Sequence, residues 1–153
     1  MKIFVDSSIL IEYIKDQKTV LLEEMFIQSL PLYYNSIVLT EYIYYFLGHH
    51  GTKSPRTLKE NKRIPEIVIQ NEPLGLLSLF EQVNNPEPSS STVIRLMKTY
   101  NLLPNDAIIL AHCLTAGIHY LASYDSDFQI PCASEGVTLI DTVEVFHTHF
   151  PAS

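Results

Sequence analysis

The sequence predicts an α/β protein of three layers (an α/β/α sandwich) in which helices cover both faces of a central parallel sheet. Short apolar runs that suit buried strands alternate along the chain with longer segments of helical periodicity. Right-handed crossovers between parallel strands place helices on both faces of a sheet. At 153 residues the chain has the length of one such unit, so residues 1–153 are assigned to a single domain.

The first elements follow from the N-terminal third. The run "KIFVD" predicts a strand that ends in Asp6, and "SSILIEYIKD" predicts a helix with Ser7 or Ser8 as its N-cap. A second helix is expected at about 20–29, because Pro31 follows it. "LYYN" is a short strand candidate.

The middle of the chain is less regular. "SIVLTEYIYYFLG" predicts a helix capped by Ser36 and stopped by Gly48. "HHGTKSPRTLKENKRIP" is the most polar region and is expected to be a loop or an exposed helix, whereas "PLGLLSLFEQV" is ambiguous between helix and strand. "NNPEPSSS" is the clearest break in the chain.

The last third returns to the alternating pattern. "STVIRLMKTYN" predicts an amphipathic helix, and a second helix is expected at 104–116 with Gly117 just past its end. "IHYLAS" and "GVTLID" predict the last two strands, and a short tail helix is expected around 142–147.

The charge is acidic overall, at −7, and unevenly distributed. Five of the ten basic residues fall within positions 53–63, and no Lys or Arg follows Lys98. The acidic total argues against a protein that coats nucleic acid. It still permits an enzyme that meets nucleic acid through one basic segment.

No apolar run reaches the length of a membrane span, and Asp6 and Glu12 interrupt the N-terminal apolar stretch, which argues against a signal peptide. Cys113 and Cys132 form no metal or redox motif. We therefore expect reduced thiols and a cytoplasmic protein without membrane association.

Three aspartates are expected at one edge of the sheet. In an open parallel sheet the binding crevice lies beyond the carboxyl ends of the strands. Asp6 ends the first strand, Asp125 follows the strand at 118–123, and Asp106 lies in the first turn of the helix before that strand. Each has a simpler explanation: Asp6 as a helix cap, Asp106 as a partner of the helix dipole, Asp125 or Asp127 as a turn former.

Glu41 is a fourth candidate. It lies on one helical stripe with Ile37 and Tyr45, and no Lys or Arg lies within a turn of it. A glutamate on an apolar stripe is costly unless it is paired or binds a cation. Clustered carboxylates repel each other unless a cation neutralises them, and a set of oxygen ligands suits Mg²⁺ or Mn²⁺. Such ions act on phosphates, so the pattern points to metal-dependent phosphodiester chemistry.

Four segments in this order, "KIFVDSSILIEYI", "SIVLTEYIYYFL", "LLPNDAIILAHCLTAG" and "IHYLASYDSDF", resemble the PIN-domain nucleases, particularly the toxin ribonucleases of VapBC-type toxin–antitoxin pairs. The resemblance covers essentially the whole chain and is weakest from 49 to 91. It implies a PIN-like domain with an Mg²⁺ or Mn²⁺ site in which Asp127 is an accessory or alternate ligand. The implied catalytic and metal-binding residues are Asp6, Glu41, Asp106 and Asp125.

The resemblance also implies roles for polar neighbours of these acids. Ser7 and Ser123 are candidates to hold metal-bound water, although each also suits a cap or turn, and Asn105 is a candidate to position substrate. The cluster at 53–63 is the one concentration of positive charge, so its residues are candidate RNA contacts, with a solvated polar loop as the alternative. The candidate RNA-contacting residues are Lys53, Arg56 and Lys59.

The implied reaction is hydrolysis of RNA by a metal-activated water without a covalent intermediate, and Asp106 is a candidate to help deprotonate that water. The implied partners are an antitoxin protein and a second copy in a homodimer. One alternative is a catalytically inactive PIN-like module that binds RNA or protein, although all four acids are present. Another is a phosphohydrolase of small esters; a covalent aspartyl-phosphate enzyme would want an acid where Ser8 stands.

Overall fold

The computed structural model describes residues 1–83 and 85–151, and this part of the chain contains a five-stranded parallel sheet in the order β3-β2-β1-β4-β5. β1 is central and pairs with β2 on one side and β4 on the other. The predicted parallel sheet is confirmed. The strands are β1 (Ile3–Val5), β2 (Leu32–Tyr34), β3 (Glu81–Gln82), β4 (Tyr120–Ala122) and β5 (Thr138–Ile140).

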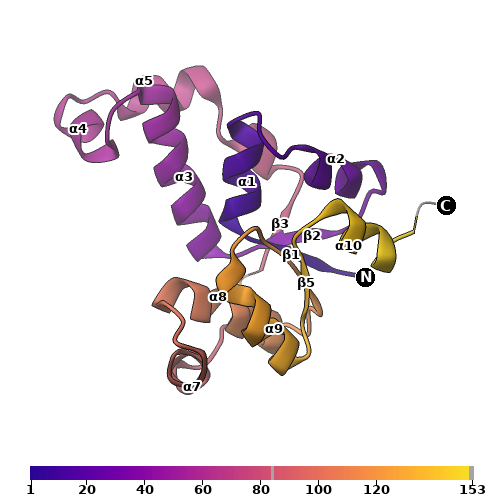
Figure 1. The fold of residues 1–153 in the computed structure, drawn as a ribbon. Helices are drawn as coiled ribbons and strands as arrows, with labels where there is room; N and C mark the ends of the chain where they lie inside the picture. Colours follow the sequence, from indigo (N-terminus) through magenta and orange to yellow (C-terminus); the bar gives the residue numbers. More distant parts are fainter. Residues whose placement is uncertain (84, 152–153) are drawn as a thin grey trace.

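Helices form two layers around this sheet (Figure 1). α1, α2, α3 and α10 lie on one side and α7, α8 and α9 on the other, while α4 and α5 project beyond the sheet from the end of α3. Their bounds are α1 Ser7–Ile14, α2 Val20–Ile27, α3 Ser36–Gly51, α4 Pro55–Glu60, α5 Ile64–Asn71, α6 Leu74–Leu77, α7 Ser90–Tyr100, α8 Pro104–Thr115, the 3₁₀ turn η1 Ser126–Phe128, α9 Gln129–Glu135 and α10 Val143–His149. Across the described ranges, none of these helices combines the length and hydrophobicity that a membrane crossing requires.

The β1–β4 register determines where the first aspartate lies. Val5 is opposite Ala122, and the backbone N–H of Asp6 donates to the carbonyl of Ala122 at 2.9 Å. Asp6 therefore leaves the sheet beside Ser123. Because both strands are parallel, their carboxyl ends open at the same edge, as the sequence predicts.

The predicted caps of two helices were wrong by one or two positions. Asp6, not Ser7 or Ser8, is the N-cap of α1, because its extended backbone lets its carboxylate accept from the N–H of Ser8 at 3.3 Å. The simpler role of Asp6 as a helix cap is thereby confirmed. Asn35, not Ser36, caps α3, since its side-chain oxygen accepts from the N–H of Val38 at 3.0 Å. In both cases the residue that ends the strand also starts the helix.

The predicted stop of α3 at Gly48 was also wrong, because the helix continues through Gly48 to Gly51 and Thr52 takes the left-handed conformation at its end. Gly51 permits a close contact. A Cβ at this position would overlap the side chains of Leu58 and Ile67, so glycine lets α4 and α5 pack against the end of α3.

Other parts of the chain resolve the ambiguous predictions. The polar region after α3 forms the exposed helix α4, and "PLGLLSLFEQV" divides into α6 and the edge strand β3. The predicted break begins at residue 84, which lies outside the described residues; its remainder leads into α7. The helix α9, which contains Pro131, was not predicted. Cys113 and Cys132 are buried free thiols.

A buried hydrogen bond joins α3 to α8, the two helices that carry Glu41 and Asp106. The Nδ2 of Asn35 lies 3.0 Å from the Nδ1 of His112, and both side chains are buried. Because the Asn35 oxygen caps α3, its amide donates to a neutral imidazole, whose pKa burial lowers. The Nε2 of His112 has no partner among the described residues. One asparagine thus fixes two site-bearing helices to each other.

Replacing Asn35 by alanine should destabilise the fold by about 2 kcal/mol, because α3 loses its cap and the Nδ1 of His112 loses its donor. Asn35→Ser keeps a capping oxygen but cannot reach His112, so we expect roughly half that loss. Urea unfolding followed by circular dichroism measures both. An alanine variant as stable as the wild type would show that neither contact contributes.

Candidate metal centre

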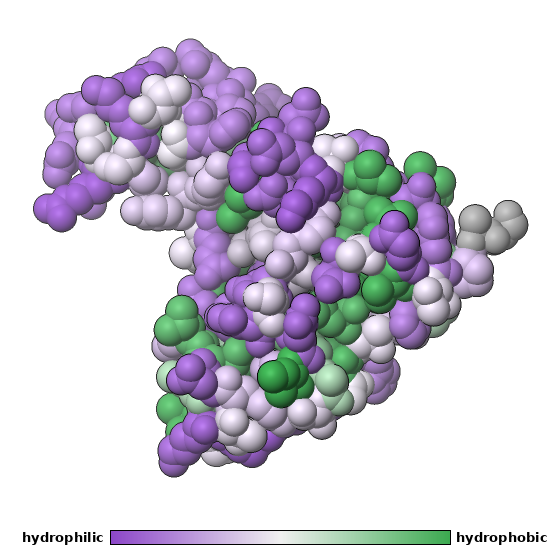
Figure 2. Space-filling view, viewed as in Figure 1, coloured by the Kyte–Doolittle hydropathy of each residue, from purple (hydrophilic) through white to green (hydrophobic). Residues whose placement is uncertain are grey.

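A cleft of about 610 Å³ opens at the carboxyl edge of the sheet, between α1, α3 and α8. Four acids that are distant in sequence face it, as predicted. Figure 2 shows this face hollowed between the hydrophilic α4–α5 projection and the part of the molecule built by α7 and α8. The cleft is lined by Asp6, Ser7, Ser8, Ile11, Glu12, Thr40, Glu41, Tyr44, Tyr45, Asp106 and Asp125.

Asp6 is buried and held by neutral donors. Its Oδ2 accepts from the hydroxyl of Ser8 at 2.6 Å and from the hydroxyl of Ser123 at 2.8 Å. The hydroxyl oxygens of Ser8 and Ser123 also lie 3.2 Å apart, and the Ser8 hydroxyl accepts from the backbone N–H of Tyr124 at 3.0 Å. Capping and site formation are therefore compatible: the carboxylate that caps α1 also lines the cleft.

Glu41 bridges the two other walls of the cleft. Its Oε2 accepts from the hydroxyl of Ser7 on α1 at 2.6 Å, and its Oε1 accepts from the Nδ2 of Asn105 on α8 at 2.6 Å. Both donors are neutral, so they orient the carboxylate without cancelling its charge. Ser7 and Asn105 thus support Glu41, and Ser123, which is fully buried, supports Asp6.

The third group consists of Asp106, Asp125 and Asp127, each with one carboxylate oxygen within 4.8 Å of the others. Asp125 caps η1 by accepting from the N–H of Asp127 at 2.9 Å, and its own N–H donates to the hydroxyl of Ser123 at 3.0 Å. Asp125 lines the cleft, whereas Asp127 lines a separate groove between α7 and α9. Asp125 therefore faces the cleft with the other acids, and Asp127 lies at its margin.

The negative charge of these groups is not balanced by nearby cations. Within residues 1–83 and 85–151, none of the five acids forms an ion pair. Burial, followed by the charges of Asp125, Asp6, Glu41 and Asp127, raises the pKa of Asp106 to about 6. Burial also raises the pKa of Asp6. A set of clustered oxygen donors without His or Cys fits Mg²⁺ or Mn²⁺.

Several residues of the cleft were not predicted from the sequence. Glu12 lies in it but forms an ion pair with Lys15 at 2.7 Å, and Tyr44 and Tyr45 flank Glu41 on α3. Ser8, a predicted helix cap, instead donates its hydroxyl to Asp6 in the cleft. A signal was available for Glu12, because it lies one helical turn after Ser8 on the same face.

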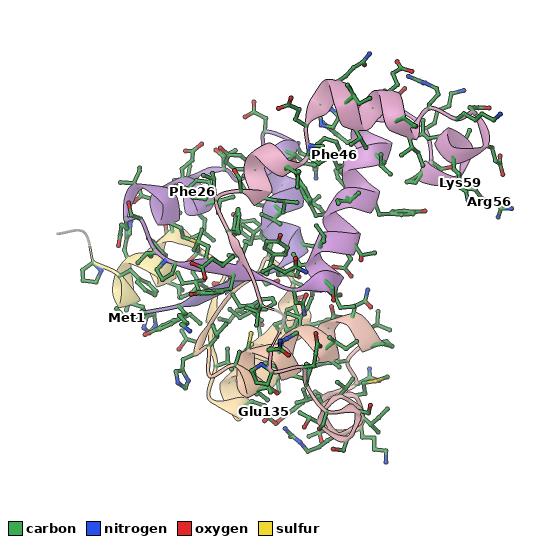
Figure 3. All side chains as sticks on the ribbon, turned by 180° about the vertical axis from the view of Figure 1, so that it is seen from behind. Met1, Phe26, Phe46, Arg56, Lys59 and Glu135 are labelled. Carbon is green, nitrogen blue, oxygen red and sulfur yellow. The ribbon has the colours of Figure 1, made fainter. Side chains whose placement is uncertain are left out.

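The basic residues predicted to contact substrate do not line the cleft. Lys53 follows α3, and Arg56 and Lys59 lie on α4, at the tip of the projection in Figure 3. Glu41 and Gly51 are separated by about 15 Å along α3. Any substrate contact by these residues must therefore be made at the far end of that helix.

The contribution of Asp106 to the stability of the metal-free protein should fall as pH rises from about 4 to about 6. The folded pKa of Asp106 lies above its unfolded value of 3.8, so folding disfavours the ionised form. Asp106→Asn removes this cost and should stabilise the metal-free fold at pH 7 by roughly 1 kcal/mol, after allowance for solvent screening. Urea unfolding in EDTA at pH 4 and pH 7 tests this; an asparagine variant less stable at pH 7 would contradict it.

Comparison with known proteins gives evidence on the family of this chain that does not depend on the geometry of the cleft. The family model described as PIN domain matches residues 3–132. The chain is similar to two proteins of Methanocaldococcus jannaschii, Ribonuclease VapC2 (28% identity, 84% of this chain and 87% of that protein) and Ribonuclease VapC6 (30% identity, 83% and 90%).

Solved structures share the fold at low sequence identity. PAE2754 from Pyrobaculum aerophilum superposes with a TM-score of 0.59 at 14% identity, covering 97% of this chain and 90% of that one. DNA-bound VapBC from Salmonella typhimurium gives 0.59 at 18% identity, covering 92% and 97%. With its fold, its acidic cleft and the match over residues 3–132, this chain belongs to the PIN-domain family.

Proposed function

We propose that this protein is an Mg²⁺- or Mn²⁺-dependent endoribonuclease that hydrolyses RNA phosphodiester bonds. The observation that carries the proposal is the convergence of Asp6, Glu41, Asp106 and Asp125, from four different segments, on one cleft. No described cation pairs with them. All four acids are present, so we do not favour the alternative of an inactive binding module.

The ligands of the proposed site are these four acids, with Asp127 as an accessory. When bound, a divalent ion would lower the pKa of a coordinated water and stabilise charge on the phosphate oxygens. The chain's own contribution is to hold the ligands rigidly. Ser8 and Ser123 fix Asp6, and Ser7 and Asn105 fix both oxygens of Glu41. The acids therefore need little rearrangement when a cation arrives.

The relatives support a role as the toxin of a toxin–antitoxin pair. The two similar proteins from Methanocaldococcus jannaschii are named VapC ribonucleases, and a solved neighbour is VapBC2 of Rickettsia felis bound to a promoter DNA fragment (16% identity, TM-score 0.56). We propose by analogy that an antitoxin binds this chain, that the chain forms a homodimer, and that it acts in the cytoplasm.

We further propose that the basic segment 53–63 contacts the RNA backbone. It carries five basic residues against one acidic residue, Glu60. Glu60 pairs with Arg56 at 3.3 Å, but both side chains are exposed, so phosphate can replace this weak pair. An acidic protein needs such a local patch to bind a polyanion.

Asp106→Asn should weaken Mn²⁺ binding at least about tenfold and abolish RNA cleavage, because it removes a central ligand of the cluster. Isothermal titration calorimetry and a gel-based cleavage assay measure the two effects. Asp125→Asn should weaken binding more than Asp127→Asn.

Glu12→Gln is the matched control, since Glu12 lines the same cleft but is paired with Lys15. It should leave Mn²⁺ affinity within about twofold. If Glu12→Gln and Asp106→Asn lose Mn²⁺ affinity equally, the proposal of a specific metal site is refuted. A folded wild type that binds neither Mg²⁺ nor Mn²⁺ at millimolar concentration would refute metal-dependent catalysis.

Reversing the charge of Lys53 and Arg56 should weaken RNA binding and reduce its salt dependence. Each lost phosphate contact should lower the slope of log K against log salt by about 0.7. Fluorescence anisotropy with a labelled RNA at several salt concentrations measures this slope. Lys98→Glu, a charge reversal at an exposed position on α7, is the control. If it lowers the slope as much as the Lys53 and Arg56 changes do, the basic segment has no special role.

A further inference from the structure

The outer face of α3 connects the acidic cleft to the basic segment and carries exposed aromatic side chains. Tyr44 is 61% exposed, Tyr45 is partly exposed and His49 is exposed. These residues follow Glu41 along the helix, and Lys53 comes directly after Thr52, which ends it. Among the described residues, the side chains that hydrogen-bond to Asp6 and Glu41 are serines and Asn105, and none of these three rings is among them.

The hollow surface is continuous along this face. Tyr44 and Tyr45 line the acidic cleft, and the same two residues line a second hollow of about 360 Å³ together with Gly48, His49 and Pro55. Pro55 is the first residue of α4 and adjoins Arg56. A flexible ligand that enters the cleft can therefore continue along α3 through the second hollow, which ends beside the positive charges.

The rings on this path are arranged for stacking. Tyr45 and His49 are stacked, with centroids 6.0 Å apart and planes inclined by 22°. One turn beyond Tyr44 stands Gly48, which has no side chain to cover the tyrosine ring. An exposed aromatic ring with an open face is the kind of surface on which unpaired bases stack.

We propose that this face of α3 is the path of single-stranded RNA, with bases stacked on Tyr44 and on the Tyr45–His49 pair. The backbone then runs between the acidic cleft at one end and Lys53 and Arg56 at the other. This inference rests on the proposed function for its substrate. RNA is favoured over a protein ligand because the concave path joins a phosphodiester-cleaving site to the basic cluster at 53–63.

The path selects unpaired RNA for a physical reason. In a duplex the faces of the bases are covered by their neighbours, whereas a single strand exposes them to aromatic rings. Stacking is tolerant of base identity, so this surface would bind single strands broadly and leave the choice of cleavage position to the cleft.

The test is the affinity of a fluorescein-labelled eight-nucleotide single-stranded RNA, measured by anisotropy in EDTA so that no cleavage occurs. Tyr44→Ala should weaken binding about tenfold, and Tyr44→Phe, which keeps the ring, should stay within about twofold of wild type. Ile69→Ala is the matched control, because Ile69 is 75% exposed on the neighbouring α5 but lies off the path. Circular dichroism checks that each variant is folded.

Two further measurements separate this inference from the proposed function. In Mn²⁺, Tyr44→Ala should raise KM for RNA cleavage and leave Mn²⁺ affinity unchanged, because the ring touches substrate but no metal ligand depends on it. If wild type cleaves nothing but Tyr44→Ala still loses RNA affinity, the path stands and the nuclease proposal fails.

The opposite result is equally clear. If wild type cleaves RNA and Tyr44→Ala, alone or with Tyr45→Ala, binds the eight-nucleotide strand as tightly as wild type, the path is refuted and this face is left to a protein partner. A duplex of the same sequence that binds as well as the single strand would also refute it.

Discussion

The parallel pairing of β1 with β4 is the constraint on which the site depends. It places Asp6 beside Ser123 at the end of two neighbouring strands, and the chain after each strand then supplies a further part of the cleft. A register shift of one residue would turn the alternate side chains of β1 to the other face and carry Asp6 away from Ser123. Such a shift would also bring Lys2 or Asp6 into the fully buried position of Ile3 or Val5, which opposes it.

The carboxylates of the cleft are held by hydrogen bonds from neutral side chains. Ser7, Ser8, Ser123 and Asn105 all donate to the carboxylates and contribute no positive charge. A lysine or arginine would bind the acids more strongly, but it would also neutralise the negative charge that attracts a metal ion. Burial raises the pKa of Asp106, and the uncompensated charges of the neighbouring acids raise it further. The fold tolerates this cost because hydrogen bonds such as Asn35 to His112 hold the helices together.

The length of α3 separates the acidic cleft from the basic segment 53–63, although the two are close together in the sequence. Glu41 stands near its first turn and faces the cleft, while the last turn leads to the basic projection. Because a helix is rigid over this length, charges at its two ends do not neutralise each other, and the acidic and basic regions keep their own character. The basic residues at 53–63 therefore do not share a pocket with the acids, although few residues separate them along the chain.

The sequence by itself determined the parallel α/β architecture and the acids at the sheet edge, because strand ends and first helical turns are local features that periodicity reveals. It misplaced the N-caps of α1 and α3 and the end of α3, since competition between Asp6 and Ser7, or between Gly48 and Gly51, is settled by backbone geometry and by the packing of α4 and α5. Only the tertiary structure decided which hydroxyls hold which carboxylates, and that Lys53 does not line the cleft. Those facts depend on distances between segments far apart in the chain, which no local pattern encodes.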